Sequence, residues 1–517
     1  MTHQQIQELL LPGASVQGDE TYCQVDASEF SILVGKLHTE IGLPLSLVYA
    51  TDDRKELGTF GVHAVLSLDE EAKWMVISTS VPADDPVYPS LTRTFMASHW
   101  YERYLQDMFG ITAEGHPDPR RLVHHENIPE GTHPLRKDFA WDTKLDHAQV
   151  PYPMHHVQGE GIYEIPVGPI HAGIIEPGHF RFNVAGERII TLEGKLFFTH
   201  KGVEKLLEGK TPLEALPFIE RLSGDMAASH TLAFCQAIEK ISGTVIPPRA
   251  RAIRTALCEL ERITMHIHDL ANIAGMGTGY TLMAANGFRI KERLMRFSQD
   301  LLGNRFWRGA IEPGGVTRDW TKEECDLVDR VASEAVMEMQ ELIKMAMQSD
   351  GLRERLETSG VLKYEAAIAY GAVGLPARAS GILRDVRASH PYAAYPEVSW
   401  NMVTATDGDV YARYRCRVDE LDVSLKILQE VLHLHQGTAV TVDVKPQDGS
   451  ALSAVESWRG EILTVVHLKG NKIERCMPRD PSFCNWPLFG EIGPGNIVPD
   501  FPLCNKSLNL SYSGTDM

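Results

Sequence analysis

The chain has 517 residues, 43% of them hydrophobic, which is enough for two or three domains with large cores. Its formal net charge is -19. This charge argues against nucleic acid as a partner, because phosphate binding needs clustered Lys and Arg, and against direct binding to anionic lipid. Charge, Gly or Pro breaks every apolar run well short of the roughly 20 residues of a membrane span. We expect a cytoplasmic chain, and docking on a membrane partner stays open.

The eight cysteines are widely spaced, and no two of them form a C-x-x-C pair. In a cytoplasmic chain of this size, such spacing is typical of free thiols. Zinc and iron–sulfur sites usually show close pairs. We therefore expect no metal site or iron–sulfur cluster held by this chain alone.

The first elements, from about residue 20 to 110, alternate strand and helix signals and predict a compact α+β domain. The stretch "SLTRTFMASHWYERYLQDMFG" predicts an amphipathic helix that ends at Gly110. Residues 112 to 160 are rich in Pro, Gly, His and charge, which indicates a loop-rich linker.

The segment from about 160 to 200 predicts a small antiparallel sheet with turns at Gly and Pro. After it the chain is mainly helical. One helix is expected to end near Gly243, and the next begins with prolines, which suit a first helical turn. Apolar residues at helical spacing predict a bundle of long helices; they are Ile253, Leu257, Leu260, Ile267 and Leu270, then Leu421, Leu425, Leu428 and Leu432. The last 80 residues are expected to return to strands and loops.

Several stretches, in order along nearly the whole chain, together resemble one family. "WYERYLQDMFGITAEGHPDPRRL" and "GTHPLRKDF" are similar to the 30-kDa-type subunit of respiratory complex I. "GPIHAGIIEPGHFRF", "ERLSGDMAASHTLAFCQAIE", "LPARASGILRDVRASHPYAAY" and "DFPLCNKSLNLSYSGTDM" resemble the large subunit of group 4 membrane-bound [NiFe] hydrogenases. That subunit is related to the 49-kDa-type subunit of complex I, and the two-part fusion resembles the formate hydrogenlyase type.

The resemblance implies an α+β fold with two domains. Residues 1–145 would form a 30-kDa-like α/β domain with its linker. Residues 146–517 would form a domain like the hydrogenase large subunit and the 49-kDa subunit, a long-helix bundle with a small antiparallel sheet.

The hydrogenase metal ligands are absent from the positions that the resemblance assigns to them. Four thiolates from two C-x-x-C motifs hold nickel and iron in these enzymes, because thiolate is a soft, strongly donating ligand. The corresponding residues here are Ser223, Met226, Ser511 and Gly514. The sequence therefore predicts the branch of hydrogenase-related proteins that lack all four ligands, with no metal at these positions.

Other family positions are kept. Glu176 matches the glutamate expected to pass protons, and Arg378 matches the arginine expected over the active site. Because a buried Arg or Glu is costly unless paired, both are candidate cavity residues, and inherited scaffold residues paired with each other are the alternative. His171, His179, His230 and Tyr512 are candidates for an acceptor site. The Tyr and His that bind quinone in complex I do not carry over directly, since they fall near Gly224 and Pro177.

Two functions follow from the resemblance. In the first, the chain carries electrons in a complex I-like assembly at the cytoplasmic side of the cell membrane. A small subunit with a [4Fe-4S] cluster would be the donor, a quinone or similar carrier the acceptor, and antiporter-like membrane subunits would use the reaction to move ions. In the second, the chain is a structural or coupling subunit without redox chemistry. A true hydrogenase with unusual ligands is the least favoured interpretation.

Overall fold

The computed structural model describes all residues except 1–2, 11–12, 173–174 and 446. The N-terminal region is built on a five-stranded sheet with strand order β1-β2-β5-β4-β3, in which β2 and β5 are parallel and the other neighbours antiparallel. The strands are β1 Ser15–Gln17, β2 Glu20–Gln24, β3 Leu45–Asp53, β4 Thr59–Leu68 and β5 Lys73–Pro82. Helices α2 (Ala27–Thr39) and α4 (His99–Phe109) pack on this sheet. The predicted α+β domain is confirmed.

Helix α4 ends where the sequence predicts, at Gly110 with φ 74°, but it begins later than the predicted stretch, after a 3-10 turn at Met96–Ser98. The buried carboxylate of Asp107, in its last turn, accepts hydrogen bonds from the backbone N–H groups of Leu122, Val123 and His124. These bonds fasten the following segment to the domain. The described residues 115–161 form no helix or strand, and the predicted boundary between residues 145 and 146 falls there.

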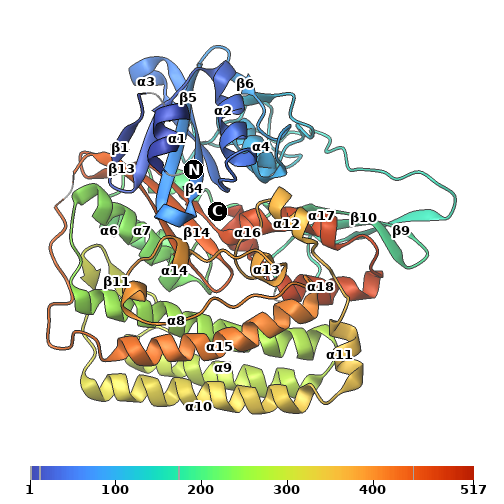
Figure 1. The fold of residues 1–517 in the computed structure, drawn as a ribbon. Coiled ribbons are helices and arrows are strands. Elements are labelled where there is room, and N and C mark those ends of the chain that lie inside the picture. The colour runs from blue at the N-terminus through green and yellow to red at the C-terminus, as the bar shows by residue number, and fades with distance from the viewer. Residues whose placement is uncertain (1–2, 11–12, 173–174, 446) are drawn as a thin grey trace.

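The predicted antiparallel sheet follows, with order β10-β9-β8, made of β8 (Ile162–Val167), β9 (His179–Ala185) and β10 (Arg188–Lys195). The β9–β10 end projects from the body of the molecule in Figure 1. The long-helix bundle is also confirmed. Its members lie side by side along the lower part of Figure 1: α8 (Pro248–Ala271), α9 (Thr281–Leu302), α10 (Lys322–Ala346) and α15 (Val410–Leu432). Helix α7 (Ala227–Ser242), which ends at left-handed Gly243, lies above them.

The C-terminal region differs in part from the expectation of strands and loops. Strands β13 (Gly449–Glu456), β14 (Glu461–Lys469) and β15 (Lys472–Arg479) form an antiparallel sheet, but several short helices follow. They include α16 (Pro481–Asn485), α18 (Phe501–Leu508) and α19 (Tyr512–Asp516). Such helices are too short to show an apolar stripe. Two of those named begin at a side-chain cap: Asp480 caps α16 and Ser511 caps α19.

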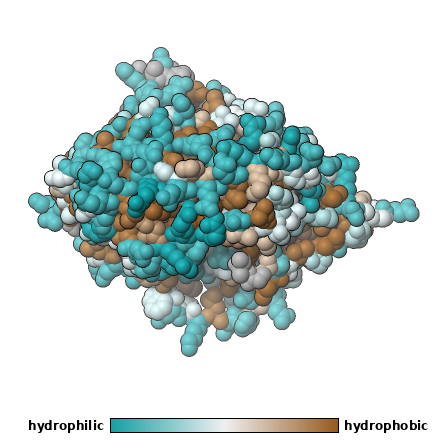
Figure 2. All heavy atoms as spheres, turned by 90° about the horizontal axis from the view of Figure 1, so that it is seen from below, coloured by the Kyte–Doolittle hydropathy of each residue, from teal (hydrophilic) through white to brown (hydrophobic). Residues whose placement is uncertain are grey.

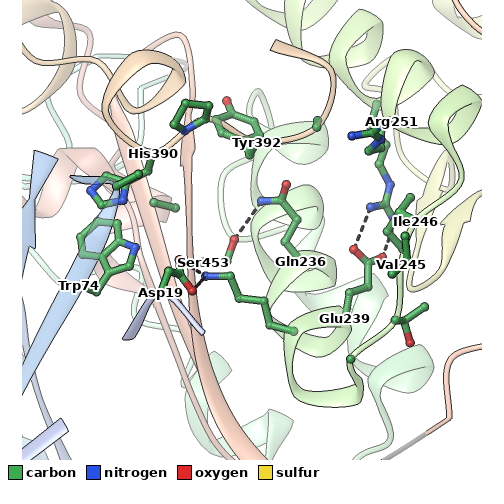
Figure 3. A pocket seen from close by; sticks show the side chains of 18 of the residues that line it. Asp19, Trp74, Gln236, Glu239, Val245, Ile246, Arg251, His390, Tyr392 and Ser453 are labelled. Atoms are coloured by element: carbon green, nitrogen blue, oxygen red, sulfur yellow. Dashed lines mark hydrogen bonds and ion pairs between the residues drawn. The ribbon is translucent and has the colours of Figure 1, made fainter. Parts of the chain in front are cut away.

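The sheet of the N-terminal region packs against the C-terminal region through specific contacts. Trp74 stacks on His390 with ring centres 4.0 Å apart, and Lys240 on α7 pairs with Asp19 at 2.7 Å. All four residues line a cavity of about 520 Å³, and Figure 3 shows Trp74, His390 and Asp19 on its walls.

The face on the side of α9 and α10 is largely hydrophilic, with scattered apolar patches (Figure 2). Among the described helices, none combines the length and apolar character needed to cross a bilayer.

Candidate functional site

The four positions where the resemblance places metal ligands meet in the folded chain. Ser223 and Met226 lie in the turn between α6 (Pro212–Ile219) and α7, and Met226 directly precedes α7. Ser511 and Gly514 come from α19 and the residue that caps it. All four are buried. The Ser223 and Ser511 hydroxyl oxygens are 2.9 Å apart and share a hydrogen bond across 288 residues of sequence. We call this buried group the serine site.

Asp480 closes the serine site at Gly514. A Cβ atom added to Gly514 would lie 2.2 Å from Asp480 Oδ2, so the aspartate occupies the space that a side chain there would need. His230, from α7, is 3.0 Å from the same oxygen through its Nε2. Burial alone would raise the pKa of Asp480, but the hydrogen bond and charge of His230 and the charge of Arg459 lower it overall. Asp480 is therefore held ionised beside Gly514.

Arg459 is the arginine that contacts this site. It forms a two-pronged ion pair with Asp225 (2.7 and 2.8 Å), and its Nη1 lies 3.5 Å from the Ser223 hydroxyl. Its guanidinium also lies 3.9 Å from the centre of the Trp458 ring. Burial would raise the pKa of Asp225, but Arg459 and the Ser223 hydroxyl bring it down to about 2. The partly exposed ion pair Asp225–Arg459 and the buried hydrogen-bonded pair His230–Asp480 thus flank the two serines.

Tyr512 and His171, two of the predicted acceptor-site residues, lie together at the outer side of the serine site. The Tyr512 hydroxyl is 3.4 Å from His171 Nε2, and His171 Nδ1 is 3.1 Å from the Pro169 carbonyl oxygen. Since a carbonyl can only accept, Nδ1 donates to it, and Nε2 faces the Tyr512 hydroxyl. Gly178 makes room for this tyrosine, because a Cβ there would lie 2.5 Å from Tyr512 Cε1.

The other predicted residues are distributed unevenly. Glu176 is exposed and accepts a 2.7 Å hydrogen bond from the Ser513 backbone N–H, so it touches α19 from outside. Lys201 Nζ donates to the Ser513 carbonyl and hydroxyl oxygens on the same side. His179 begins β9 and lies 3.4 Å from the Gly168 carbonyl oxygen through Nδ1.

Arg378 lies in a different buried cluster. Its guanidinium pairs with Glu420 at 2.5 Å, Glu456 at 2.6 Å and Asp385 at 3.4 Å. The cluster continues from Glu420 to His266 at 2.6 Å and from Asp385 to Arg387 at 2.8 Å. Arg378 is fully buried, and the alternative interpretation, a paired scaffold residue, describes its surroundings. Its partners, however, are these acids and not Glu176.

Sequence reasoning missed Asp225, Arg459 and Asp480. Asp225 stands inside "RLSGDM", between Ser223 and Met226, and that position was a usable signal. Arg459 lies in the turn between the largely buried strands β13 and β14, where a Trp-Arg pair is unusual. For Asp480, the only hint in the sequence is the proline that follows it, which is common in the first turn of a helix.

Comparison with known proteins agrees with this architecture. Residues 23–144 match the family model of the 30-kDa subunit of respiratory-chain NADH dehydrogenase, and residues 277–446 match that of its 49-kDa subunit. Hydrogenase-4 component G of Escherichia coli K12 is 33% identical over 91% of this chain and 83% of its own length. Formate hydrogenlyase subunit 5 of the same organism is 32% identical over 96% and 89%. The fused C/D component of the NADH-quinone oxidoreductase of Bacteroides fragilis is 30% identical over 75% and 77%. The chain belongs to the family of fused 30-kDa and 49-kDa complex I-type subunits that includes these hydrogenase and oxidoreductase components.

Proposed function

We propose that this chain is an electron-transfer subunit of a complex I-like, hydrogenase-related oxidoreductase and works without a nickel–iron centre. Its electrons would come from a [4Fe-4S] cluster in a partner iron–sulfur subunit and pass to a quinone or a similar carrier. The chain would sit on membrane-embedded, antiporter-like subunits at the cytoplasmic side of the membrane, and the reaction would be coupled there to ion translocation.

The donor set of the serine site does not fit a nickel–iron centre. It offers two hydroxyls, one thioether and a residue without a side chain, where soft thiolates are required. The two hydroxyls already bond each other, and Asp480 fills the space beside Gly514. We therefore assign no step to such a metal. The residues that could do chemistry are those at the outer side of the site.

The Tyr512–His171 pair is the single observation that carries the quinone proposal. A quinone gains two electrons and two protons on reduction, and its carbonyl oxygens accept hydrogen bonds from hydroxyl and imidazole groups. The bond between Tyr512 and His171 is long, at 3.4 Å, so a carbonyl oxygen would compete for the hydroxyl. Burial raises the pKa of Tyr512, which keeps its phenol protonated and able to donate.

We expect the electron donor to bind at the side of α19 that Glu176 and Lys201 contact. Both side chains reach Ser513, one residue from Tyr512, and both hydrogen bonds are exposed to solvent. An iron–sulfur partner that covers this side would bring its cluster close to the proposed acceptor pair. Glu176 and Lys201 would then be available as proton carriers to Tyr512.

A second candidate is a structural or coupling subunit with no redox step of its own. The serine–serine hydrogen bond and the position of Asp480 favour it, because both fill space that a cofactor would otherwise use. In this case the Tyr512–His171 pair would only stabilise α19.

The test is reoxidation of the purified complex. Its iron–sulfur clusters are first reduced chemically, a short-chain quinone is added, and cluster absorbance is followed in wild type and in Tyr512→Phe. The matched control is Tyr163→Phe, a half-exposed tyrosine whose hydroxyl donates to the Gly186 carbonyl oxygen. Losing one hydrogen bond to the reacting carbonyl should slow reoxidation by about tenfold to a hundredfold.

Fast reoxidation in wild type and in Tyr163→Phe, with a clear loss in Tyr512→Phe, supports the quinone site. Reoxidation that is equally fast in all three proteins rejects Tyr512 as part of it. If quinone reoxidises none of them while their clusters stay intact, the structural or coupling function is favoured instead.

A further inference from the structure

A second polar cavity, of about 180 Å³, lies on the far side of Trp486 from the serine site. Its walls come from α4, from the segment that follows it, from β10 and from residues 486–490. Cationic side chains line it, chiefly Arg103, Arg120 and Lys195, and aromatic rings face them. This volume is large enough for several water molecules or for a small ion.

Two of the three cations are already paired within the cavity wall. Arg120 binds Asp118 through two 2.7 Å bonds and reaches Glu193 at 2.5 Å. Arg103 lies 3.3 Å from Asp118 and donates to the carbonyl oxygens of Arg120 and Arg121. The two carboxylates that line the cavity, Asp118 and Glu193, are thus neutralised by Arg103 and Arg120.

Lys195 remains as the under-coordinated cation. Its side chain is only 5% exposed, and the ion pair it makes among the described residues is with Glu126 at 3.4 Å, whose side chain is 52% exposed. Its Nζ also lies 3.6 Å from the centre of the Tyr152 ring. An ammonium carries three N–H groups, and a buried one needs acceptors for them. Lys195 Nζ donates one hydrogen bond, to Glu126, whereas His99 Nδ1 is a buried atom of this cavity wall without a hydrogen-bond partner among the described residues.

We propose that this cavity binds a small oxyanion, such as bicarbonate, phosphate or a short carboxylate, with one oxygen accepting from Lys195. Arg103 and Arg120 balance the charges of Asp118 and Glu193, so Lys195 is the group that would hold the ion, through a charge-assisted hydrogen bond. The inference goes beyond the proposed quinone site, since the anion takes part in no redox step.

Trp486 would connect the anion to the serine site. Its ring lines the cavity, its indole N–H lies 3.3 Å from the Ser511 carbonyl oxygen, and its ring centre is 4.8 Å from that of Tyr512. An ion in the cavity therefore lies one side chain away from both residues. Binding of the anion would thus change the position of Tyr512.

The experiment is a titration of the full-length chain with sodium bicarbonate, phosphate and acetate, at constant ionic strength balanced by chloride, followed by thermal unfolding. Wild type should show a saturable rise of the unfolding temperature with at least one of the three ions. Lys195→Met should weaken that binding by about tenfold or more, and Lys195→Arg should keep most of it. The matched control is Lys205→Met, which removes a lysine of similar burial outside the cavity.

Tryptophan emission gives a second readout on unmodified protein, which covers the case that Lys195→Met does not fold. Subtracting the emission of Trp486→Phe from that of wild type isolates Trp486, and this difference should change with the same ion and the same midpoint. The proposal is overturned if no oxyanion gives a saturable response in wild type, or if Lys195→Met binds as tightly as wild type. The ion that binds most tightly identifies the class of oxyanion.

Discussion

The serine site and the Arg378 cluster are both buried, charged and drawn from distant parts of the chain, yet they differ in what they touch. The serine site lies against the Asp225–Arg459 and His230–Asp480 pairs, and it also reaches the Tyr512–His171 pair and the exposed Glu176. In the Arg378 cluster, the two terminal nitrogens of Arg378 pair with Glu420, Glu456 and Asp385, and all four side chains are buried. The Nε of Arg378 has no hydrogen-bond partner among the described residues.

The difference shows that the contacts of a charged residue, and not its match to a family pattern, decide which site it belongs to. Arg378 and Arg459 are both fully or nearly fully buried arginines with acidic partners. Of the two, Arg459 is the one that contacts a metal-ligand position, at Ser223, within the part of the chain that the structure describes. Four predictions test whether one cluster serves stability and the other chemistry.

The largest effect is expected for Arg378→Met. This change leaves three buried carboxylates without their shared cation, and we expect the free energy of unfolding to fall by about 3–5 kcal/mol. Urea denaturation measures it. The control, Arg353→Met, breaks an exposed pair with Glu357 and should cost less than about 1 kcal/mol. A stable Arg378→Met protein that loses quinone-dependent reoxidation would move Arg378 into the functional site and remove the contrast.

A smaller change in the free energy of unfolding is expected when the pH is varied. Burial raises the pKa of Asp516, on α19, to about 6. The folded state therefore holds the proton of Asp516 more tightly than the unfolded state does. The stability that this proton adds is fully present below about pH 4 and is lost as the pH rises through 6. We expect the free energy of unfolding to fall by about 2–3 kcal/mol over this range.

Asp516→Asn should flatten this fall, as measured by urea denaturation at a series of pH values. The flattening will be partial, because burial and the charge of Asp385 also raise the pKa of Glu456, in the other cluster, to about 6. Asp26→Asn, at an exposed carboxylate, is the control and should leave the profile unchanged. A profile that Asp516→Asn also leaves unchanged would contradict the prediction.

Gly514→Ala tests the packing of the serine site. The added methyl group would meet Asp480 at 2.2 Å and force it from His230, at an expected cost of about 1–3 kcal/mol. Gly490→Ala is the control, because a Cβ there meets no atom within 4 Å. Equal stability of the two variants, measured by thermal unfolding, would show that the serine site has free space.

The smallest effect on stability is expected for Tyr512→Phe. It removes the long hydrogen bond to His171 and the hydrogen bond with Asn505, and the free energy of unfolding should fall by about 1 kcal/mol. Chemical denaturation of Tyr512→Phe and Arg378→Met under the same conditions compares the contributions of the two clusters to stability directly. A loss as large as that of Arg378→Met would mean that Tyr512 serves the fold and not a ligand.

The sequence predicts local structure well and the site only in part. The stripe from Ile253 to Leu270 predicts α8, and Gly243 marks the end of α7, because both signals depend on neighbours within a few turns. The meeting of Ser223 with Ser511 follows from the resemblance, since no local rule joins residues 288 apart. Arg459 and Asp480 were missed for the same reason: their role exists only through tertiary contacts.

The distance in sequence between Ser223 and Ser511 has a consequence for biosynthesis. A growing chain cannot complete the serine site until residue 511 has left the ribosome, although α7 and α8 have been made long before. Until then Ser223 lacks its partner Ser511, and the segment from Phe197 to Gly202 lacks its partners Asp516 and Met517. Completion of the serine site therefore depends on the packing of α19 against segments that are synthesised about 300 residues earlier.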